Sequence, residues 1–197
     1  MRSQRALRRL KPDPVPQDLL LHLLDLAVRA PSSTNRQRWD FIVIRERAQV
    51  AEFARLNRRL FLLADKVGYL KTGTPGQKRV IESVRYQCQH FEEIPVLVVA
   101  CHRGWIPPFP QLFTTSAYGS VYPAVQNLLL AARAAGLGAA LITVPLWNGW
   151  KVRRLLKLPW NITPVCLVPL GYTDEEYLPN QRRPVQEVVH WEHYGNI

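Results

Sequence analysis

The chain of 197 residues is poor in cysteine and has no uninterrupted apolar run long enough to cross a bilayer. The best candidate, residues 128–144, is broken by an arginine and two glycines, which excludes a spanning helix there. The first eleven residues lack the apolar core of a signal peptide. Cys88, Cys101 and Cys166 lie far apart without paired spacing. We therefore expect no disulfide framework, no zinc knuckle and a cytoplasmic location.

The usual side-chain sets for catalysis are also missing from the sequence. There is no Ser-His-Asp set, no pair of carboxylates and no cluster of metal ligands, and His190 and His193 lack a third ligand. The glycine-rich segment 68–76 lacks the Lys-Ser/Thr ending of a phosphate-binding loop. We expect no metal and no side chain that acts as an obligatory acid or base.

What the chain does contain is enough apolar and basic material for a globular, positively charged protein. Apolar residues make up 47% and aromatic residues 10%, which favours one folded domain over residues 1–197. The net charge of +11 permits either a nucleic-acid partner or an anionic small-molecule site. Residues 2–11 form a helix or an arm, and on a helix Arg5 and Arg8 would share one face and could clamp a phosphate.

The spacing of apolar residues predicts alternating helices and strands. Helices are expected over 16–30, 46–60, 78–91, 117–136 and 150–158. Strands are expected over 39–44, 94–101, 139–144 and 164–171, and the unbroken apolar run 94–101 indicates burial on both faces. Residues 102–116 are predicted to be a proline-stiffened aromatic loop, either a lid over a planar ligand or a packing surface.

The turn between the first helix and the first strand carries several small polar side chains. Ser32, Ser33 and Asn35 follow Pro31 and place hydroxyl, amide and backbone N–H groups close together. Such a cluster suits a polyoxygenated or phosphorylated ligand. The same residue types also form ordinary turns, so composition alone leaves both interpretations open.

Residues 30–35, Ala-Pro-Ser-Ser-Thr-Asn, followed by Gln37 and Trp39, resemble the flavin-binding motif of the FMN-dependent nitroreductase family. The resemblance implies that Ser32, Ser33 and Asn35 hold the ribityl chain and ring edge of FMN, with Pro31 beside them. Residues 126–138 also resemble the family's central helix, which forms the core of a dimer.

Three further segments carry the resemblance, each with a departure. The resemblance of the N-terminal arm implies that Arg5 and Arg8 bind the FMN phosphate, although Gln4 and Ala6 depart from the family's pattern. The tail implies that Arg183 returns to the same phosphate, with Gln181 in place of a frequent lysine. The turn containing Pro145 and Leu146 would pass over one flavin face, with Asn148 where a glutamate is expected and Gly149 retained.

Together these resemblances imply an α+β nitroreductase-like fold, with a mixed, mainly antiparallel sheet flanked by helices, in an intertwined homodimer with shared FMN sites. NAD(P)H would reduce FMN by a ping-pong mechanism, and a nitroaromatic, quinone or related electrophilic small molecule would be reduced next. Trp105, Phe109 and Phe113 are expected to shape the acceptor pocket. Two alternatives stay open: a flavin-binding or flavin-consuming member with another reaction, and a basic nucleic-acid-binding protein. We expect neither nucleic-acid nor membrane partners.

Overall fold

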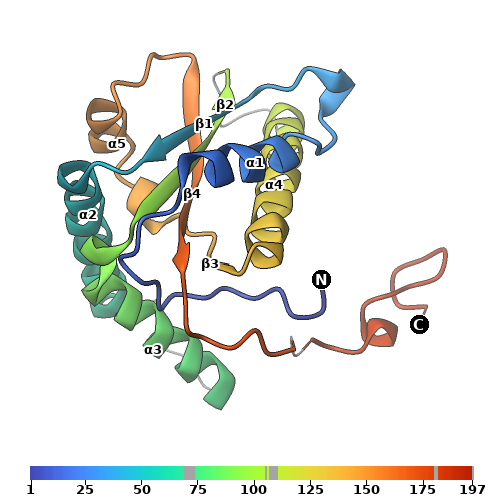
Figure 1. The fold of residues 1–197 in the computed structure, drawn as a ribbon. Coiled ribbons are helices and arrows are strands. Elements are labelled where there is room, and N and C mark those ends of the chain that lie inside the picture. The colour runs from blue at the N-terminus through green and yellow to red at the C-terminus, as the bar shows by residue number, and fades with distance from the viewer. Residues whose placement is uncertain (69–73, 105, 107–110, 180–181, 197) are drawn as a thin grey trace.

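The computed structural model describes residues 1–68, 74–104, 106, 111–179 and 182–196, with only the backbone described for 111–113. Its centre is a four-stranded sheet in the order β1-β2-β4-β3 (Figure 1). The strands are β1 (Trp39–Ile44), β2 (Val96–Arg103), β3 (Leu137–Ala139) and β4 (Ile162–Tyr172). All three pairings in this sheet are antiparallel, so the parallel component of the expected mixed sheet is not found within these residues.

The two central strands are buried on both faces, as the apolar run in the sequence predicted. Along β2, Val96, Val98 and Ala100 pack into one hydrophobic core. The intervening Leu97, Val99 and Cys101 pack into a second core on the opposite face. This alternation follows from the two-residue period of a strand, and the run is continuous because helices cover both sides.

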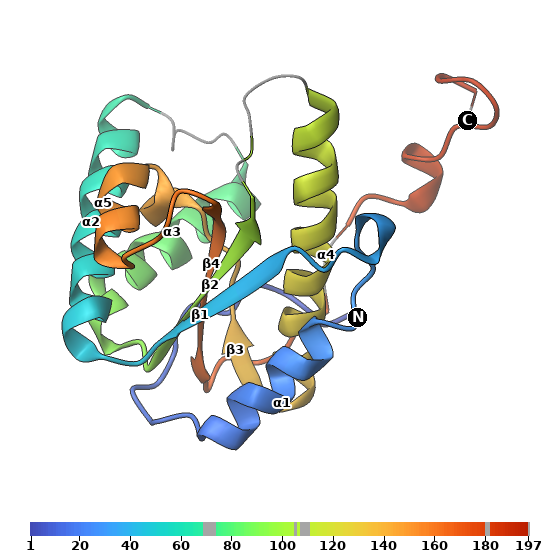
Figure 2. The ribbon, with the colours of Figure 1, turned by 90° about the horizontal axis from the view of Figure 1, so that it is seen from above.

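Helices cover the two faces of the sheet in two groups (Figures 1 and 2). One group is α1 (Gln17–Ala27) and α4 (Gln111–Ala134), which pack on the first core. On the other side lie α2 (Arg47–Lys66), α3 (Pro75–Gln89) and α5 (Gly149–Leu155). Short 3-10 helices complete the described elements: η1 (Ser33–Asn35), η2 (Phe91–Glu93), η3 (Val144–Leu146) and η4 (Val185–Glu187).

Several elements differ from the expectations drawn from the sequence. Helix α4 begins at Gln111, inside the segment 102–116 that was expected to be an irregular loop, so that expectation was wrong for its second half. The strand expected over 139–144 was misplaced, because β3 spans Leu137–Ala139 and only an isolated bridge between Ile142 and Leu167 lies in the rest of that range. Pro145, which has no N–H to donate to a ladder, instead lies in η3.

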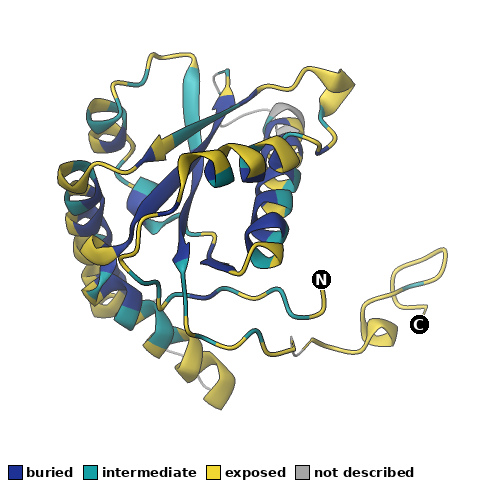
Figure 3. Ribbon diagram, in the orientation of Figure 1, coloured by how far each residue is buried: buried dark blue, intermediate teal, exposed yellow. Residues whose placement is uncertain are grey.

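Both ends of the chain leave the body on the same side as β3 (Figure 1). The N-terminal arm, residues 1–11, contains no helix, so of the two expected conformations the structure has the arm. The C-terminal tail, residues 173–196, is mostly exposed (Figure 3). In the described part of the chain, no helix combines the length and the apolar character that crossing a membrane requires.

Candidate functional site

The polar turn after α1 is tied to helix α4 by a buried hydroxyl group. The backbone N–H of Ser33 donates to Oγ of Ser120 at 3.2 Å, and that hydroxyl donates to the carbonyl of Ser116 at 2.9 Å. Ser32 Oγ accepts a hydrogen bond from the backbone N–H of Gln37 at 3.0 Å, which closes the turn. The turn is therefore a fixed structure on the surface of the protein.

The backbone of this turn is strained. Thr34, Asn35 and Gln37 have φ angles of 50°, 52° and 49°, in the left-handed region that residues other than glycine rarely adopt. Strain of this kind is typically retained at sites where it positions groups for binding. Oδ1 of Asn35 accepts a hydrogen bond from Gln37 Nε2 at 3.2 Å, which leaves the amide N–H groups of Asn35 available to a ligand. Ser33, Asn35 and Pro31 are exposed, and Ser32 is half-buried.

The N-terminal arm is held along β3 and the end of β4. Leu7 is fully buried and its N–H donates to the carbonyl of Ala139 at 3.1 Å, while the N–H of Lys11 donates to Tyr172 at 2.8 Å. The carboxylate of Glu175 accepts hydrogen bonds from the backbone N–H groups of Arg8 and Arg9 at 2.8 and 2.9 Å. These contacts fix an extended segment, so its arginines are not placed by helical spacing.

Arg8 is the arm residue whose environment most favours an anionic ligand. Its guanidinium is largely buried, and within the described residues its Nε has no hydrogen-bond partner. Burial lowers the pKa of Arg8, the carboxylate of Glu175 opposes that change, and the positive charge of Arg5 lowers it further. A phosphate oxygen would supply the missing hydrogen bond and offset the cost of burying the charge. Arg5 itself is exposed.

Helix α3 brings further polar groups towards the arm, and nothing in the sequence singles them out. The guanidinium of Arg9 lies over the ring of Tyr86 at 4.3 Å. Gln87, next in the chain, is 2% exposed, yet its Nε2 has no partner among the described residues. Asn57 Nδ2 donates to the sulfur of Cys88 at 3.1 Å. A buried glutamine on an amphipathic helix carries no signal in a single sequence that distinguishes it from an exposed one.

The turn around Pro145 accounts for the departure at Asn148. Pro145 is buried and Leu146 is half-buried in η3. Oδ1 of Asn148 accepts a hydrogen bond from the backbone N–H of Lys151 at 3.2 Å and so caps the first turn of α5. The side chain found where a glutamate was expected therefore starts a helix.

The remaining predicted residues are not assembled with these groups. Arg183 is exposed in the tail, and among the described residues the hydrogen bonds of 184–196 join only tail residues to one another. Trp105 and Phe109 lie outside the described residues. The backbone of Phe113 lies in α4, not in a loop. In the described part of the chain, no three His, Cys, Asp or Glu side chains are grouped to hold a metal.

A single chain keeps the arm and the polar turn apart. The turn is bonded to Ser120, and the arm is bonded to Ala139, which lies beyond the far end of α4 at Ala134. The part of α4 between Ser120 and Ala134 is about 21 Å long. Figure 1 shows η1 level with the start of α4 and the N-terminal arm below its end. The predicted cofactor residues of the arm and those of the turn therefore lie apart within one chain.

The comparisons with known proteins agree with this fold and these motifs. The sequence model of the Nitroreductase family matches residues 1–172, and the chain belongs to this family. An NADH dehydrogenase of Thermus thermophilus is 28% identical, over 96% of this chain and 92% of that protein. An iodotyrosine deiodinase of Thermotoga neapolitana is 26% identical, over 95% of this chain and 92% of that protein.

Solved structures of the same fold include flavoproteins. An oxidized iodotyrosine deiodinase bound to FMN and 3-iodo-L-tyrosine superposes with a TM-score of 0.71 at 25% identity, covering 97% of this chain and 95% of that one. A BluB-like flavoprotein from Clostridium difficile superposes with a TM-score of 0.73 at 20% identity, covering 95% and 94%. The nitroreductase-like α+β fold expected from the sequence is confirmed.

The residues present fit FMN as the cofactor. The buried Nε of Arg8 and the buried Nε2 of Gln87 are donors without partners in the described structure, and FMN carries a phosphate and ring carbonyls that accept hydrogen bonds. The exposed donors of Ser33 and Asn35 suit the hydroxyl groups of a ribityl chain.

Proposed function

We propose that this protein is an FMN-dependent oxidoreductase that takes electrons from NAD(P)H and passes them to an electrophilic small molecule, such as a nitroaromatic or a quinone, by a ping-pong mechanism. The observation that carries the proposal is the largely buried Arg8, whose unpartnered Nε suits a phosphate on an arm that also carries Arg5. Bound FMN supplies the electron transfer, so the protein needs no catalytic acid or base of its own.

In this proposal the arm and the polar turn are two half-sites of the FMN site, and each has a distinct task. Arg5, Arg8 and Arg183 neutralise the phosphate, and the largely buried guanidinium of Arg8 contributes most because its charge is least screened by water. Gln87 adds a donor from α3. The turn residues Ser32, Ser33 and Asn35, with Pro31, hold the ribityl chain and the ring edge. The turn containing Pro145 and Leu146 would pass over one ring face, with Pro145 itself buried.

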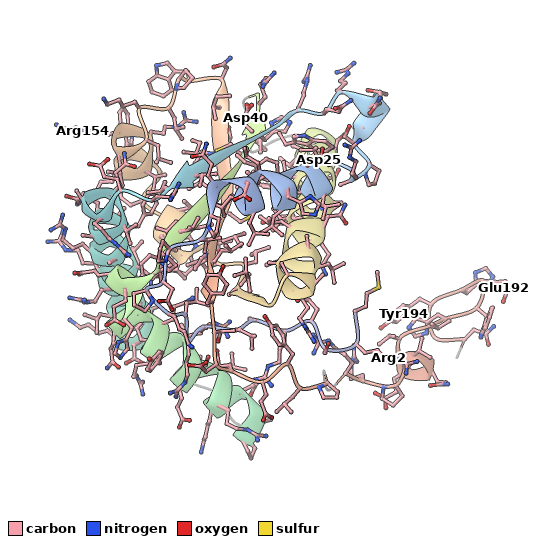
Figure 4. The ribbon with its side chains drawn as sticks, in the orientation of Figure 1. Arg2, Asp25, Asp40, Arg154, Glu192 and Tyr194 are labelled. Atoms are coloured by element: carbon pink, nitrogen blue, oxygen red, sulfur yellow. The ribbon has the colours of Figure 1, made fainter. Side chains whose placement is uncertain are left out.

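Two copies of the chain are needed to bring the half-sites together. The arm and the turn lie at opposite ends of α4, so the arm of one copy would meet the turn of the other across a homodimer. The tail supports this arrangement, because Trp191 and Tyr194 are 63% and 93% exposed. Figure 4 shows Tyr194 and Glu192 far from the body of their own chain. A partner subunit would cover these side chains.

The cofactor is tested first by an absorption spectrum of the purified protein, with the released chromophore identified by mass. We expect flavin bands and one FMN per chain, bleached by NADH or NADPH and restored by a nitroaromatic or a quinone. A colourless protein that does not take up added FMN would refute the proposal. Steeply salt-dependent DNA binding by such a protein would favour the nucleic-acid alternative.

The shared site is tested by mixing two inactive variants, Arg8→Gln and Asn35→Ala. If each site takes its arm from one chain and its turn from the other, a mixed dimer contains one intact site and one doubly defective site. Random exchange would then restore about a quarter of the wild-type activity. If both half-sites of each site came from one chain, mixing would restore nothing.

The expected acceptor pocket remains part of the proposal. Trp105, Phe109 and Phe113 would line it, because aromatic side chains suit planar acceptors. Replacing Phe109 with alanine should change KM or kcat for at least some acceptors. Unchanged kinetic constants for every acceptor tested would remove Phe109 from the pocket.

A second candidate activity is reductive removal of halogen from a halogenated phenol. The observation in its favour is the group of iodotyrosine deiodinase relatives, including one that is 26% identical over 95% of the chain. Release of iodide from 3-iodotyrosine by the reduced protein would support this activity. Rapid reoxidation by nitroaromatics with no halide release would favour the first candidate.

A further inference from the structure

A groove lined mainly by cations lies between α2 and α5, on the side of the sheet opposite α1 and α4. Its volume is about 550 Å³. The positive charges come from two elements: Arg55 and Arg59 of α2, and Lys151 and Arg154 of α5. The spacings of four and three residues keep each pair on one face of its helix, so all four side chains converge on one hollow. None of them belongs to either proposed half-site.

Most of this positive charge is not neutralised by the protein. Glu52 lines the same groove and pairs with Arg55. Arg59, Lys151 and Arg154 have no ion-pair partner within the part of the chain that the structure describes. The groove therefore keeps a local excess of three positive charges. Such an excess raises the local concentration of anions.

Helix electrostatics explains one of these cations but not the others. Arg154 lies in the last turn of α5, where a positive charge is favourable. Lys151 lies in the first turn of the same helix, where a positive charge is unfavourable. Arg59 lies in the interior of α2, away from either end. Figure 4 shows Arg154 at the outer side of α5, where a ligand from solution could reach it.

The shape of the groove favours a small ligand over a polymer. A volume of about 550 Å³ lies within the range of small-molecule sites. The cations surround one hollow, whereas a nucleic-acid backbone is followed by a longer basic track. Leu56 and Leu155 add apolar wall to the same groove. The combination suits a compact molecule with several negative charges.

We propose that the groove between α2 and α5 binds a small molecule bearing several phosphate groups, through Arg59, Lys151 and Arg154. Each arginine can donate two parallel hydrogen bonds to phosphate oxygens, and the lysine adds a point charge. A free polyphosphate compound and a phosphorylated lipid headgroup share this chemistry. This site does not depend on the proposed flavin chemistry.

The test is calorimetric titration of the whole 197-residue chain with inorganic tripolyphosphate at low salt, with and without added FMN. Added FMN occupies the proposed phosphate site on the arm, so binding that persists in its presence arises elsewhere. We expect one tripolyphosphate per chain to remain bound when FMN is present. The double variant Arg59→Gln/Arg154→Gln should bind at least about tenfold more weakly.

A matched control separates the groove from net charge. Arg79→Gln/Arg85→Gln removes the same two charges from exposed positions on α3 and should change the affinity by less than about twofold. If the groove double variant does not fold, Lys151→Gln alone serves, because no hydrogen bond or ion pair of its side chain is found within the described residues. Equal losses in the groove and control variants, or no heat with the wild type, would overturn the proposal.

Vesicles with and without phosphoinositides, and a short oligonucleotide, complete the titrations. Vesicle binding that tripolyphosphate displaces would identify a lipid headgroup as the source of the phosphates and support the proposal. Oligonucleotide binding that the groove variant abolishes, with no binding of tripolyphosphate, would overturn it in favour of a polymer surface.

Discussion

Replacing Ser120 with alanine removes the buried hydroxyl that joins the strained turn to α4. Ser120 is 6% exposed, and its Oγ accepts the N–H of Ser33 at 3.2 Å. The turn has few other attachments of this kind, because the hydrogen bond between Ser32 and Gln37 is internal to it. We therefore expect Ser120→Ala both to destabilise the protein and to loosen the turn.

The two hydrogen bonds of Ser120 contribute unequally. The bond from its hydroxyl to the carbonyl of Ser116 adds to the helix bond that this carbonyl already accepts, so its loss costs little. The N–H of Ser33 loses its acceptor, but water can reach this partly buried group, so the cost is about 1 kcal/mol of unfolding free energy. For a chain of this size that corresponds to a fall in Tm of about 2–4 °C.

The same loosening should weaken the cofactor. If FMN must order the turn again, about 1 kcal/mol of binding free energy is lost, which is about a fivefold rise in Kd. Urea unfolding measures the stability, and quenching of flavin fluorescence measures FMN binding. Ser116→Ala is the matched control, because its backbone carbonyl stays in place. A Ser120→Ala protein as stable as the wild type, with unchanged Kd for FMN, would refute this reasoning.

Three further predictions concern stability. Gly171→Ala should lower the unfolding free energy by about 1–3 kcal/mol, because the new Cβ would lie 2.8 Å from Cγ of Pro95. Gly76→Ala, in the open first turn of α3, should raise it by up to about 1 kcal/mol. Equal effects of the two variants in urea unfolding would contradict the packing around Gly171. Tyr177→Phe should not lower the unfolding free energy, because the tyrosine hydroxyl is buried without a partner among the described residues; a loss would reveal a bond to that hydroxyl. Burial raises the pKa of Cys88 from 9.0 to about 11, so the thiol ionises at a lower pH in the unfolded chain than in the folded one. The unfolding free energy should therefore fall between pH 9 and 11. An equally steep fall in the Cys88→Ala variant would show that other groups cause this pH dependence.

Much of the fold could be predicted because its signals are local. Strand β1 has the bounds expected from its aromatic and β-branched residues, Trp39–Ile44. The unbroken apolar run of β2 required cover on both faces, and α4 and α2 provide it. The motif at 30–35 and the central helix indicated the family that the comparison over residues 1–172 then showed. These features depend on neighbouring residues, whose spacing is visible in one sequence.

Contacts between distant residues could not be predicted in this way. The backbone N–H of Arg8 donates to the carboxylate of Glu175, which lies 167 residues further along the chain. The absence of helix in the arm has the same origin, because its N–H groups bond to Ala139 and Tyr172 instead of to one another. Gln87 became a candidate ligand only when its burial without a partner was known.

The sequence by itself indicated most of the elements, the family motif and the chemical types of the predicted cofactor residues, since these are encoded in short stretches of chain. Only the tertiary structure decided that the arm and the polar turn lie at opposite ends of α4. It alone also brought four cations of α2 and α5 around one groove. The physical reason is that folding places residues by packing and hydrogen bonding across the sheet, and these distances have no counterpart in the order of the residues.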